Sequence, residues 1–159
     1  HVATRAITYD YLWNEVRVKG GAYGTGFRRG DAGARSFWSF RDPAIDATLG
    51  RYDGCAAWLA DWDGSEDELA GYIVSTVAAH DAPAKPRALA RRQDIARFNQ
   101  KEPGWRDKVR AQELAVTADD IRALAAALAD KEPATGVCVF GGADALEASS
   151  LDLDVTPLC

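Results

Sequence analysis

The chain has 159 residues, of which 47% are hydrophobic and 27% charged, with a formal net charge of −5. No apolar run approaches the ~20 residues that a membrane-spanning helix needs, so we expect no membrane partner. The cysteines Cys55, Cys138 and Cys159 are far apart, which favours free thiols in a reducing compartment, with Cys55 and Cys138 as buried small hydrophobes.

The first predicted element is a helix from about residue 3 to residue 16. Its apolar stripe consists of Ile7, Tyr11, Leu12, Trp13 and Val16. The helix should end before Gly20, where the Gly20 and Gly21 pair lets the backbone turn sharply. Arg17 would lie at the helix end and Tyr23 beyond the turn. A guanidinium and a phenol that converge in this way suit the binding of a carbonyl oxygen that becomes negative during a reaction.

Two runs of strand length, 25–29 and 35–41, flank a turn signal at 30–33 and predict a β-hairpin. The aromatic residues of this region are Phe27, Phe37, Trp38 and Phe40. One interpretation is an exposed strip that binds peptides, but aromatic side chains in a sheet more often pack in the core, where we place most of them. Asp42 and Pro43 then predict the start of a helix, as N-cap and first helical residue.

Helical spacing predicts a helix over about 44–61 and a second one that ends near His80. Ser65 and Glu68 form a capping box at the start of the second helix. His80 lies at its end, where the helix dipole favours a histidine. A general base is the alternative, and we prefer the structural interpretation.

The segment 85–110 is basic, with nine basic and three acidic residues, while the rest of the chain has a net charge of −11. Such a stripe could bind phosphates or RNA. Its charges are spread over two predicted helices that are broken near 102–104, with Leu89, Ile95, Phe98 and Trp105 as interleaved core residues. We therefore expect a solvated helix face, and no nucleic-acid partner.

Thr117 predicts the N-cap of a further helix that buries Ile121, Leu124 and Leu128, and that ends within 131–136. Residues 137–140 predict a short buried strand, and the alternation in 151–155 predicts a final strand. The glycines of 20–26 and 141–142 lack the context of a nucleotide-binding loop. We predict one domain, 1–159, of the α+β class, with helices packed on one face of a mainly antiparallel sheet.

The chain resembles a known family at 11–13, 15–24 and 39–43. The quoted motifs are Tyr-Leu-Trp, Glu-Val-Arg-Val-Lys-Gly-Gly-Ala-Tyr-Gly and Ser-Phe-Arg-Asp-Pro. They are similar to the C-terminal domain of presequence-protease-like members of the pitrilysin/insulinase zinc peptidases. The chain contains no methionine and starts inside the first predicted helix. We therefore expect a fragment of a larger multidomain chain, truncated at its N-terminus.

The resemblance implies a zinc-dependent oligopeptidase that degrades unstructured peptides in a chamber between two halves. It implies that Arg17 and Tyr23 are catalytic, and that Arg17, Tyr23, Gly20 and Gly21 bind substrate. The zinc and its inverted H-x-x-E-H ligands would lie in the N-terminal half of the enzyme, because His1 and His80 cannot form that motif. We expect no metal in this chain, and no activity from it alone.

The alternative is a non-catalytic structural or chaperone-like subunit of the same fold. In that case Arg17 would pair with Glu15 or Asp42, and Tyr23 would fill the base of the hairpin. The alanine-rich composition hints at a bacterial source, so we expect a cytoplasmic location, or an organelle matrix in a eukaryote.

Overall fold

The computed structural model describes residues 1–30, 33–130 and 136–157. The chain begins with the α-helix α1 (Val2–Ala6), which continues without a break into η1 (Ile7–Val18). The predicted first helix is thus confirmed. Its second part has the wider π-helical geometry, in which each N–H bonds to the carbonyl five residues before it, as in the bond from Lys19 N to Asn14 O at 3.0 Å.

The predicted hairpin is also confirmed. Strand β1 (Gly24–Arg29) pairs antiparallel with β2 (Arg35–Phe40), in a register that sets Gly24 opposite Phe40 and Gly26 opposite Trp38. Part of the predicted turn, at 31–32, lies outside the described residues. One face of the hairpin lies on η1 and buries Phe27.

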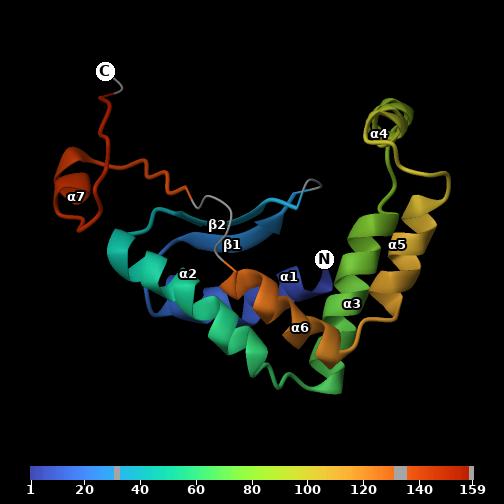
Figure 1. Ribbon diagram of the computed structural model, residues 1–159, viewed down its shortest axis with the longest axis horizontal. Helices are drawn as coiled ribbons and strands as arrows, with labels where there is room; N and C mark the ends of the chain where they lie inside the picture. The colour runs from blue at the N-terminus through green and yellow to red at the C-terminus, as the bar shows by residue number, and fades with distance from the viewer. Residues whose placement is uncertain (31–32, 131–135, 158–159) are drawn as a thin grey trace.

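Helices η1, α2 (Ile45–Ala60) and α6 (Ala118–Ala129) pack together beneath the hairpin (Figure 1). The buried core contains Val2, Ala6, Ile7, Leu12, Val16, Ala22, Phe27, Cys55, Leu59, Trp62, Ile121 and Ala125. Tyr11 links η1 to α2, since its hydroxyl donates to Arg51 O at 2.6 Å and its ring stacks on Trp58. Helices on one side of an antiparallel pair of strands confirm the predicted α+β class.

The predicted start of α2 is wrong by two residues. The N-cap is Ala44, and Asp42 accepts a hydrogen bond from Ala44 N at 3.0 Å through its side chain, so Pro43 precedes the helix. Asp42 lies two residues before the N-cap, and Arg41, just before it, has a left-handed backbone with φ of 49°. The N–H group of Ala44 thus bonds to the Asp42 side chain as expected for a cap, although Asp42 lies outside the helix.

Helix α3 (Glu66–Asp81) begins with the predicted capping box, in which Ser65 Oγ accepts from Glu68 N at 3.2 Å and Glu68 accepts from Ser65 N at 2.8 Å. Thr117 and Asp120 form the same motif at the start of α6. Helix α5 (Trp105–Leu114) packs along α3. These two helix starts could be predicted from the sequence because each capping motif is contained within four consecutive residues.

The capping boxes predict acid sensitivity. Hydrogen bonds from the Ser65 main chain, and then from its side chain, lower the pKa of Glu68 below its ordinary value of 4.5. Because the folded-state pKa is the lower one, this contribution to stability is complete above pH 4.5 and is lost as the pH falls through the lowered value. Unfolding in urea between pH 3 and 7 should show stability falling below about pH 4.5, and Glu68→Gln should flatten that part of the profile. An unchanged profile in the variant would contradict this.

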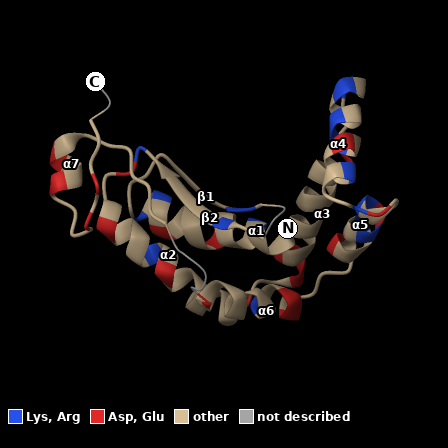
Figure 2. Cartoon of the chain, turned by 45° about the horizontal axis from the view of Figure 1, so that its top comes forward, with Lys and Arg blue, Asp and Glu red and all other residues tan. Residues whose placement is uncertain are grey.

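Helix α4 (Pro86–Phe98) extends away from the helices under the hairpin, and arginine residues lie along it (Figure 2). The break between α4 and α5 is as predicted. The assignment of Leu89, Ile95 and Phe98 to the core is wrong, because all three are exposed and α4 buries none of its residues. These residues do recur at helical spacing, but the apolar side of a helix is buried only where another element covers it.

The C-terminal predictions are wrong. Residues 137–140 form no strand and are mostly exposed, which leaves Cys138 exposed instead of buried. Residues 151–155 also have no regular structure, and a short helix, α7 (Ala143–Glu147), precedes them. Helix α6 ends at Ala129, just before the predicted segment 131–136, most of which lies outside the described residues. A strand needs a neighbouring strand to satisfy its backbone, and these segments pair with neither β1 nor β2.

The thiol of Cys55 is fully buried on α2, and burial raises its pKa to about 12. This confirms its prediction as a small hydrophobe, because a thiol with so high a pKa is not a reactive nucleophile at neutral pH. Cys159 lies outside the described residues. Among the described helices, none is long and apolar enough to cross a membrane.

Candidate functional site

The site predicted from Arg17 and Tyr23 lies where η1 ends. Gly21 N donates to Arg17 O at 3.0 Å and Ala22 N to Val16 O at 3.2 Å, so the turn satisfies the last carbonyls of the helix. Gly21 adopts the left-handed conformation with φ of 82°. The chain therefore reverses within three residues and enters β1 directly beside the helix end.

Arg17 and Tyr23 are brought into contact by this turn. Arg17 Nε donates to the main-chain oxygen of Tyr23 at 3.0 Å, and the guanidinium lies 3.8 Å from the ring centre of Trp13, one turn earlier on η1. Stacking on an indole is a favourable arrangement for an arginine. The side chain is thus held by two contacts, and among the described residues its terminal amino groups have no hydrogen-bond partner.

The Tyr23 side chain is 65% exposed. Its ring meets Phe40 edge to face, with 6.0 Å between ring centres, and the Arg41 guanidinium lies 5.7 Å from the Tyr23 ring. Within the described part of the chain, the Tyr23 hydroxyl has no hydrogen-bond partner. The phenol is therefore fixed by its ring and free to donate a hydrogen bond at its tip.

The structural interpretation of this pair does not match the geometry. Glu15 is paired with Lys19, and Asp42 accepts from Ala44 N, so neither carboxylate is seen on Arg17. Tyr23 does not fill the base of the hairpin, because most of its surface is exposed. Tyr23 is thus exposed at this turn, while Arg17 is half-buried against Trp13.

Gly20 and Gly21 have a clear conformational role. A Cβ at Gly20 would lie 2.4 Å from Val16 O and 2.8 Å from an Arg51 guanidinium nitrogen, and Gly21 has a positive φ. The turn therefore leaves no room for a side chain at Gly20 and strains one at Gly21. Their predicted contact with substrate stays a prediction.

Two glycine-to-alanine changes should have opposite effects on stability. Gly21→Ala should cost about 1–2 kcal/mol, because an alanine is strained at positive φ. Gly50→Ala should stabilise the chain by about 0.5–1 kcal/mol, because Gly50 lies inside α2 with nothing within 4 Å of an added Cβ. Urea unfolding of the two variants measures both effects, and equal signs would contradict the assigned backbone geometry.

The exposed face of the hairpin carries two of the four aromatic residues, most of which we predicted to pack in the core. Phe27 is buried and Phe37 packs against Tyr52 of α2, as predicted. Trp38 and Phe40 are instead 36% and 53% exposed. The alternation in the sequence could have indicated this exposure. Residues two apart in a strand share a face, so Trp38 and Phe40 lie on the face opposite to that of Phe27 and Phe37, which is the buried one.

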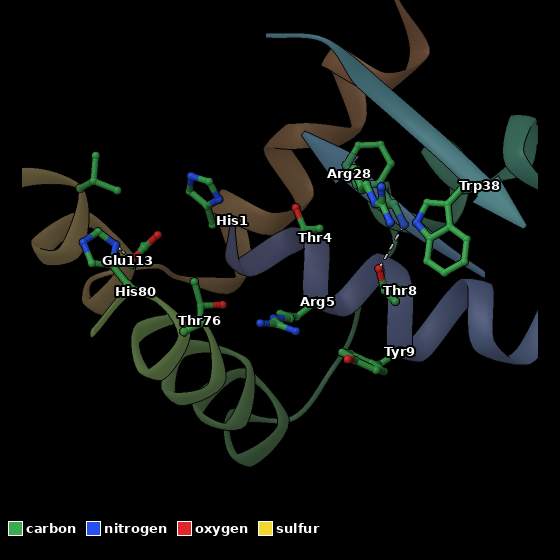
Figure 3. Close-up of a pocket in the computed structure, with 14 residues that line it drawn as sticks. His1, Thr4, Arg5, Thr8, Tyr9, Arg28, Trp38, Thr76, His80 and Glu113 are labelled. Carbon is green, nitrogen blue, oxygen red and sulfur yellow. Dashed lines mark hydrogen bonds and ion pairs between the residues drawn. The ribbon is translucent and has the colours of Figure 1, made fainter. Parts of the chain in front are cut away.

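A cleft of about 440 Å³ lies between the edge of the hairpin and helices α3 and α5 (Figure 3). The hairpin contributes Gly26, Phe27, Arg28 and Trp38 to its wall. The residues lining the rest of it include Thr4, Arg5, Thr8, Tyr9, Thr76, Ala79, His80, Val109 and Glu113. A cleft of this volume is in the range that binds small ligands or a few side chains.

His80 lies in this cleft in a structural setting. Its Nδ1 lies 3.1 Å from Glu113 Oε2, both side chains are largely buried, and Arg106 donates to His80 O at 2.8 Å. These contacts join the end of α3 to α5. The preferred interpretation, a helix-terminal structural histidine, agrees with them, although its main partner is Glu113 and not the neighbouring Asp81, which pairs with Arg110.

The residues that the structure describes do not offer a zinc site. Among them, no three or more His, Cys, Asp or Glu side chains are grouped so that they could hold a metal. Arg17 and Tyr23 are a cation and a phenol, which are not ligands for Zn²⁺ in this setting. A zinc bound elsewhere in a longer protein stays a prediction.

Comparison with known proteins places this chain among longer ones. A family model described as the PreP C-terminal domain matches residues 1–139. Protein HypA of Clostridium perfringens is 49% identical over 77 residues, which are 47% of this chain and 8% of that protein. The mitochondrial presequence protease of Danio rerio is 38% identical over 82 residues (52% and 8%), and that of Yarrowia lipolytica is 32% identical over 127 residues (78% and 12%).

The chain thus spans about a tenth of the length of the curated relatives it matches. The matched segment contains η1, the glycine turn, the hairpin and all helices through α6. Arg17 and Tyr23 lie within it. The expected resemblance is confirmed, and the chain belongs to the PreP C-terminal domain family, a family of presequence protease domains.

Proposed function

We propose that this chain is the C-terminal domain of a zinc-dependent oligopeptidase that degrades unstructured peptides, and that it supplies Arg17 and Tyr23 to the active site. The observation that carries the proposal is the turn after η1, which holds Arg17 against the main chain of Tyr23 and leaves the Tyr23 phenol exposed. Membership of a peptidase family supports it. The metal would be bound by the N-terminal half of the longer protein.

The proposed chemical role of the pair is electrostatic. Attack on a peptide carbonyl moves negative charge onto its oxygen, and donors already aimed at that oxygen stabilise the transition state. The Tyr23 hydroxyl would donate one hydrogen bond to it. The amino groups of Arg17 that do not contact Tyr23 would bind the substrate carbonyl or its neighbour and provide a permanent positive charge.

Rigid support is the second argument for this role. Donors contribute most to catalysis when they need no rearrangement during the reaction. Arg17 is held by Trp13 and by the Tyr23 carbonyl, while Tyr23 is held by Phe40. Gly20 and Gly21 set the turn that joins them, and we propose that their lack of side chains also leaves room for the substrate backbone.

Hydrolysis of an unstructured fluorogenic peptide by the full-length protein tests the proposal. We expect activity that a zinc chelator abolishes, that the isolated 159-residue chain lacks, and that Arg17→Ala lowers by about 10²–10³-fold in kcat/KM. Arg92→Ala, on the exposed helix α4, is the matched control. Absence of activity in a folded, zinc-loaded protein would contradict the proposal and favour a structural or chaperone-like subunit.

The relatives guide the proposed location. The protein of Danio rerio is named mitochondrial, and a relative from Arabidopsis thaliana is named chloroplastic/mitochondrial. We propose the cytoplasm if the source is bacterial and an organelle matrix if it is eukaryotic. Expression of the full-length protein with a fluorescent tag would distinguish these locations in its own host.

A further inference from the structure

The exposed face of the hairpin carries a row of aromatic side chains. Tyr23 contacts Phe40, and Trp38 follows Phe40 on the same face, two residues along β2. Opposite them on β1 are Gly24 and Gly26, so the Trp38 indole lies across the glycine backbone. A Cβ at Gly26 would come within 2.8 Å of the indole nitrogen. The row is therefore wide, apolar and open to solvent.

Arginines accompany this row. The Arg41 guanidinium lies 5.7 Å from the Tyr23 ring and 5.4 Å from the Phe40 ring, and the Arg28 guanidinium lies 5.2 Å from the Trp38 ring. We call Tyr23, Phe40, Trp38, Arg41 and Arg28 the hairpin stripe. Within the described residues, no carboxylate pairs with either arginine. The hairpin stripe is thus positive on a chain whose net charge is −5.

The hairpin stripe joins two features of the molecule. It begins at Tyr23, which contacts Arg17 through its carbonyl, and it ends at Trp38 and Arg28, which line the cleft of about 440 Å³. Figure 3 shows both side chains on the hairpin side of that cleft, near Thr8 of η1. A ligand held by Arg17 and Tyr23 would therefore have an apolar, positively charged track beside it.

An extended peptide fits the spacing of this track. Alternate side chains in an extended chain are about 6.6–7 Å apart, the same interval that separates Phe40 from Trp38 along β2. Aromatic rings accept apolar and aromatic side chains, and exposed guanidinium groups pair with carboxylates. Strained backbone marks the place as well, since Arg41 is a non-glycine residue with φ of 49°.

We propose that the hairpin stripe binds the substrate next to the scissile bond and selects peptides that place an apolar or aromatic residue beside an acidic one. Arg28 and Trp38 are the specificity-determining residues, and neither takes part in the bond cleavage. This inference rests on the proposed peptidase function. The occupant is the substrate peptide, and neither a second copy of the chain nor a covering domain is required.

A charge-reversal experiment in the full-length protein tests the inference. Two fluorogenic peptides, identical except for Glu or Lys beside a central Phe, are compared by kcat/KM. The wild type should prefer the Glu peptide, and Arg28→Glu should shift the Glu/Lys ratio toward Lys by roughly tenfold. Trp38→Ala should raise KM severalfold for both peptides, with kcat much less affected. The matched controls, Arg92→Glu and Phe98→Ala on α4, should leave the ratio and KM unchanged.

A binding measurement separates failure of this inference from failure of the proposed function. With zinc chelated, fluorescence anisotropy of the labelled peptides reports binding to the same proteins without hydrolysis. If nothing is cleaved but Arg28→Glu still reverses the preference in binding, the peptidase proposal fails and the hairpin stripe stands as a peptide site. If the ratio is unchanged in both assays, the inference is overturned. Loss of stability in Arg28→Glu and Phe40→Ser without any change of selectivity also overturns it, because that result means the stripe is covered by another domain.

Discussion

Tyr23→Phe should lower kcat of the full-length peptidase by about 10²-fold, with little change in KM or in the free energy of unfolding. The substitution removes only the hydroxyl, which has no partner within the described residues. The ring contact with Phe40 and the main-chain contact with Arg17 remain possible. A donor used mainly in the transition state affects kcat, so steady-state kinetics on an unstructured peptide measures the effect directly.

Tyr72→Phe is the matched control for this prediction. The Tyr72 hydroxyl on α3 donates to Asp10 of η1, which also accepts from Trp62 Nε1 at 3.1 Å. Burial raises the pKa of Tyr72, and the hydrogen bond to Asp10 adds to that effect. Loss of this hydrogen bond in Tyr72→Phe should reduce the free energy of unfolding by about 1 kcal/mol and leave kcat unchanged. A Tyr23→Phe variant that loses stability or raises KM without lowering kcat would contradict a catalytic role.

Arg17 is less suited than Tyr23 to isolate the chemical step. Its guanidinium has two structural contacts, the stacking on Trp13 and the hydrogen bond to the Tyr23 carbonyl. Removing it therefore changes the position of Tyr23 as well as the local charge. The effects of Arg17→Ala and Tyr23→Phe should consequently be less than additive, as is usual for residues that act as a unit.

The elements that were predictable from sequence depend on short-range signals. The Ser65 and Thr117 caps, the Gly20 and Gly21 turn and the hairpin each follow from a few neighbouring residues. Local preferences of this kind hold whatever the rest of the fold does. The meeting of Arg17 and Tyr23 was predictable for the same reason, because only six residues separate them.

The elements that were missed depend on what covers them. The apolar residues of α4 recur at helical spacing, but this spacing does not tell whether another element covers them. In the structure they are exposed. The segments 137–140 and 151–155 resemble strands, yet strands form only beside others. The π-helical geometry of η1 was also not predicted, because the same apolar stripe fits an α-helix or a π-helix.

The exposure of Trp38 and Phe40 shows most clearly what the sequence alone does not predict. Alternation places them on one face, but whether that face is covered is a property of the tertiary structure. The general preference of aromatic residues for the core led us to expect most of the four to be buried, whereas these two are exposed. The exception coincides with the hairpin stripe, which agrees with the idea that local rules fail most often at functional sites.

The largest effect on stability is expected from Leu59→Ala. Leu59 is fully buried on α2, in the core that α2, η1 and α6 form beneath the hairpin. Truncation removes buried apolar surface and leaves a cavity that neighbours such as Ile121 fill only in part. The expected cost is about 3 kcal/mol. Urea unfolding of the 159-residue chain would measure it as a lower midpoint at unchanged slope.

Leu114→Ala tests whether the cost comes from burial. Leu114 ends α5 and is 51% exposed, so the same chemical change there should cost less than about 1 kcal/mol. The comparison also bears on the site, because the helix pair η1 and α2 supports the turn that joins Arg17 to Tyr23. Leu59→Ala should leave kcat of the folded full-length protein nearly unchanged. Equal costs for the two leucines would mean that the core beneath the hairpin is not packed as described.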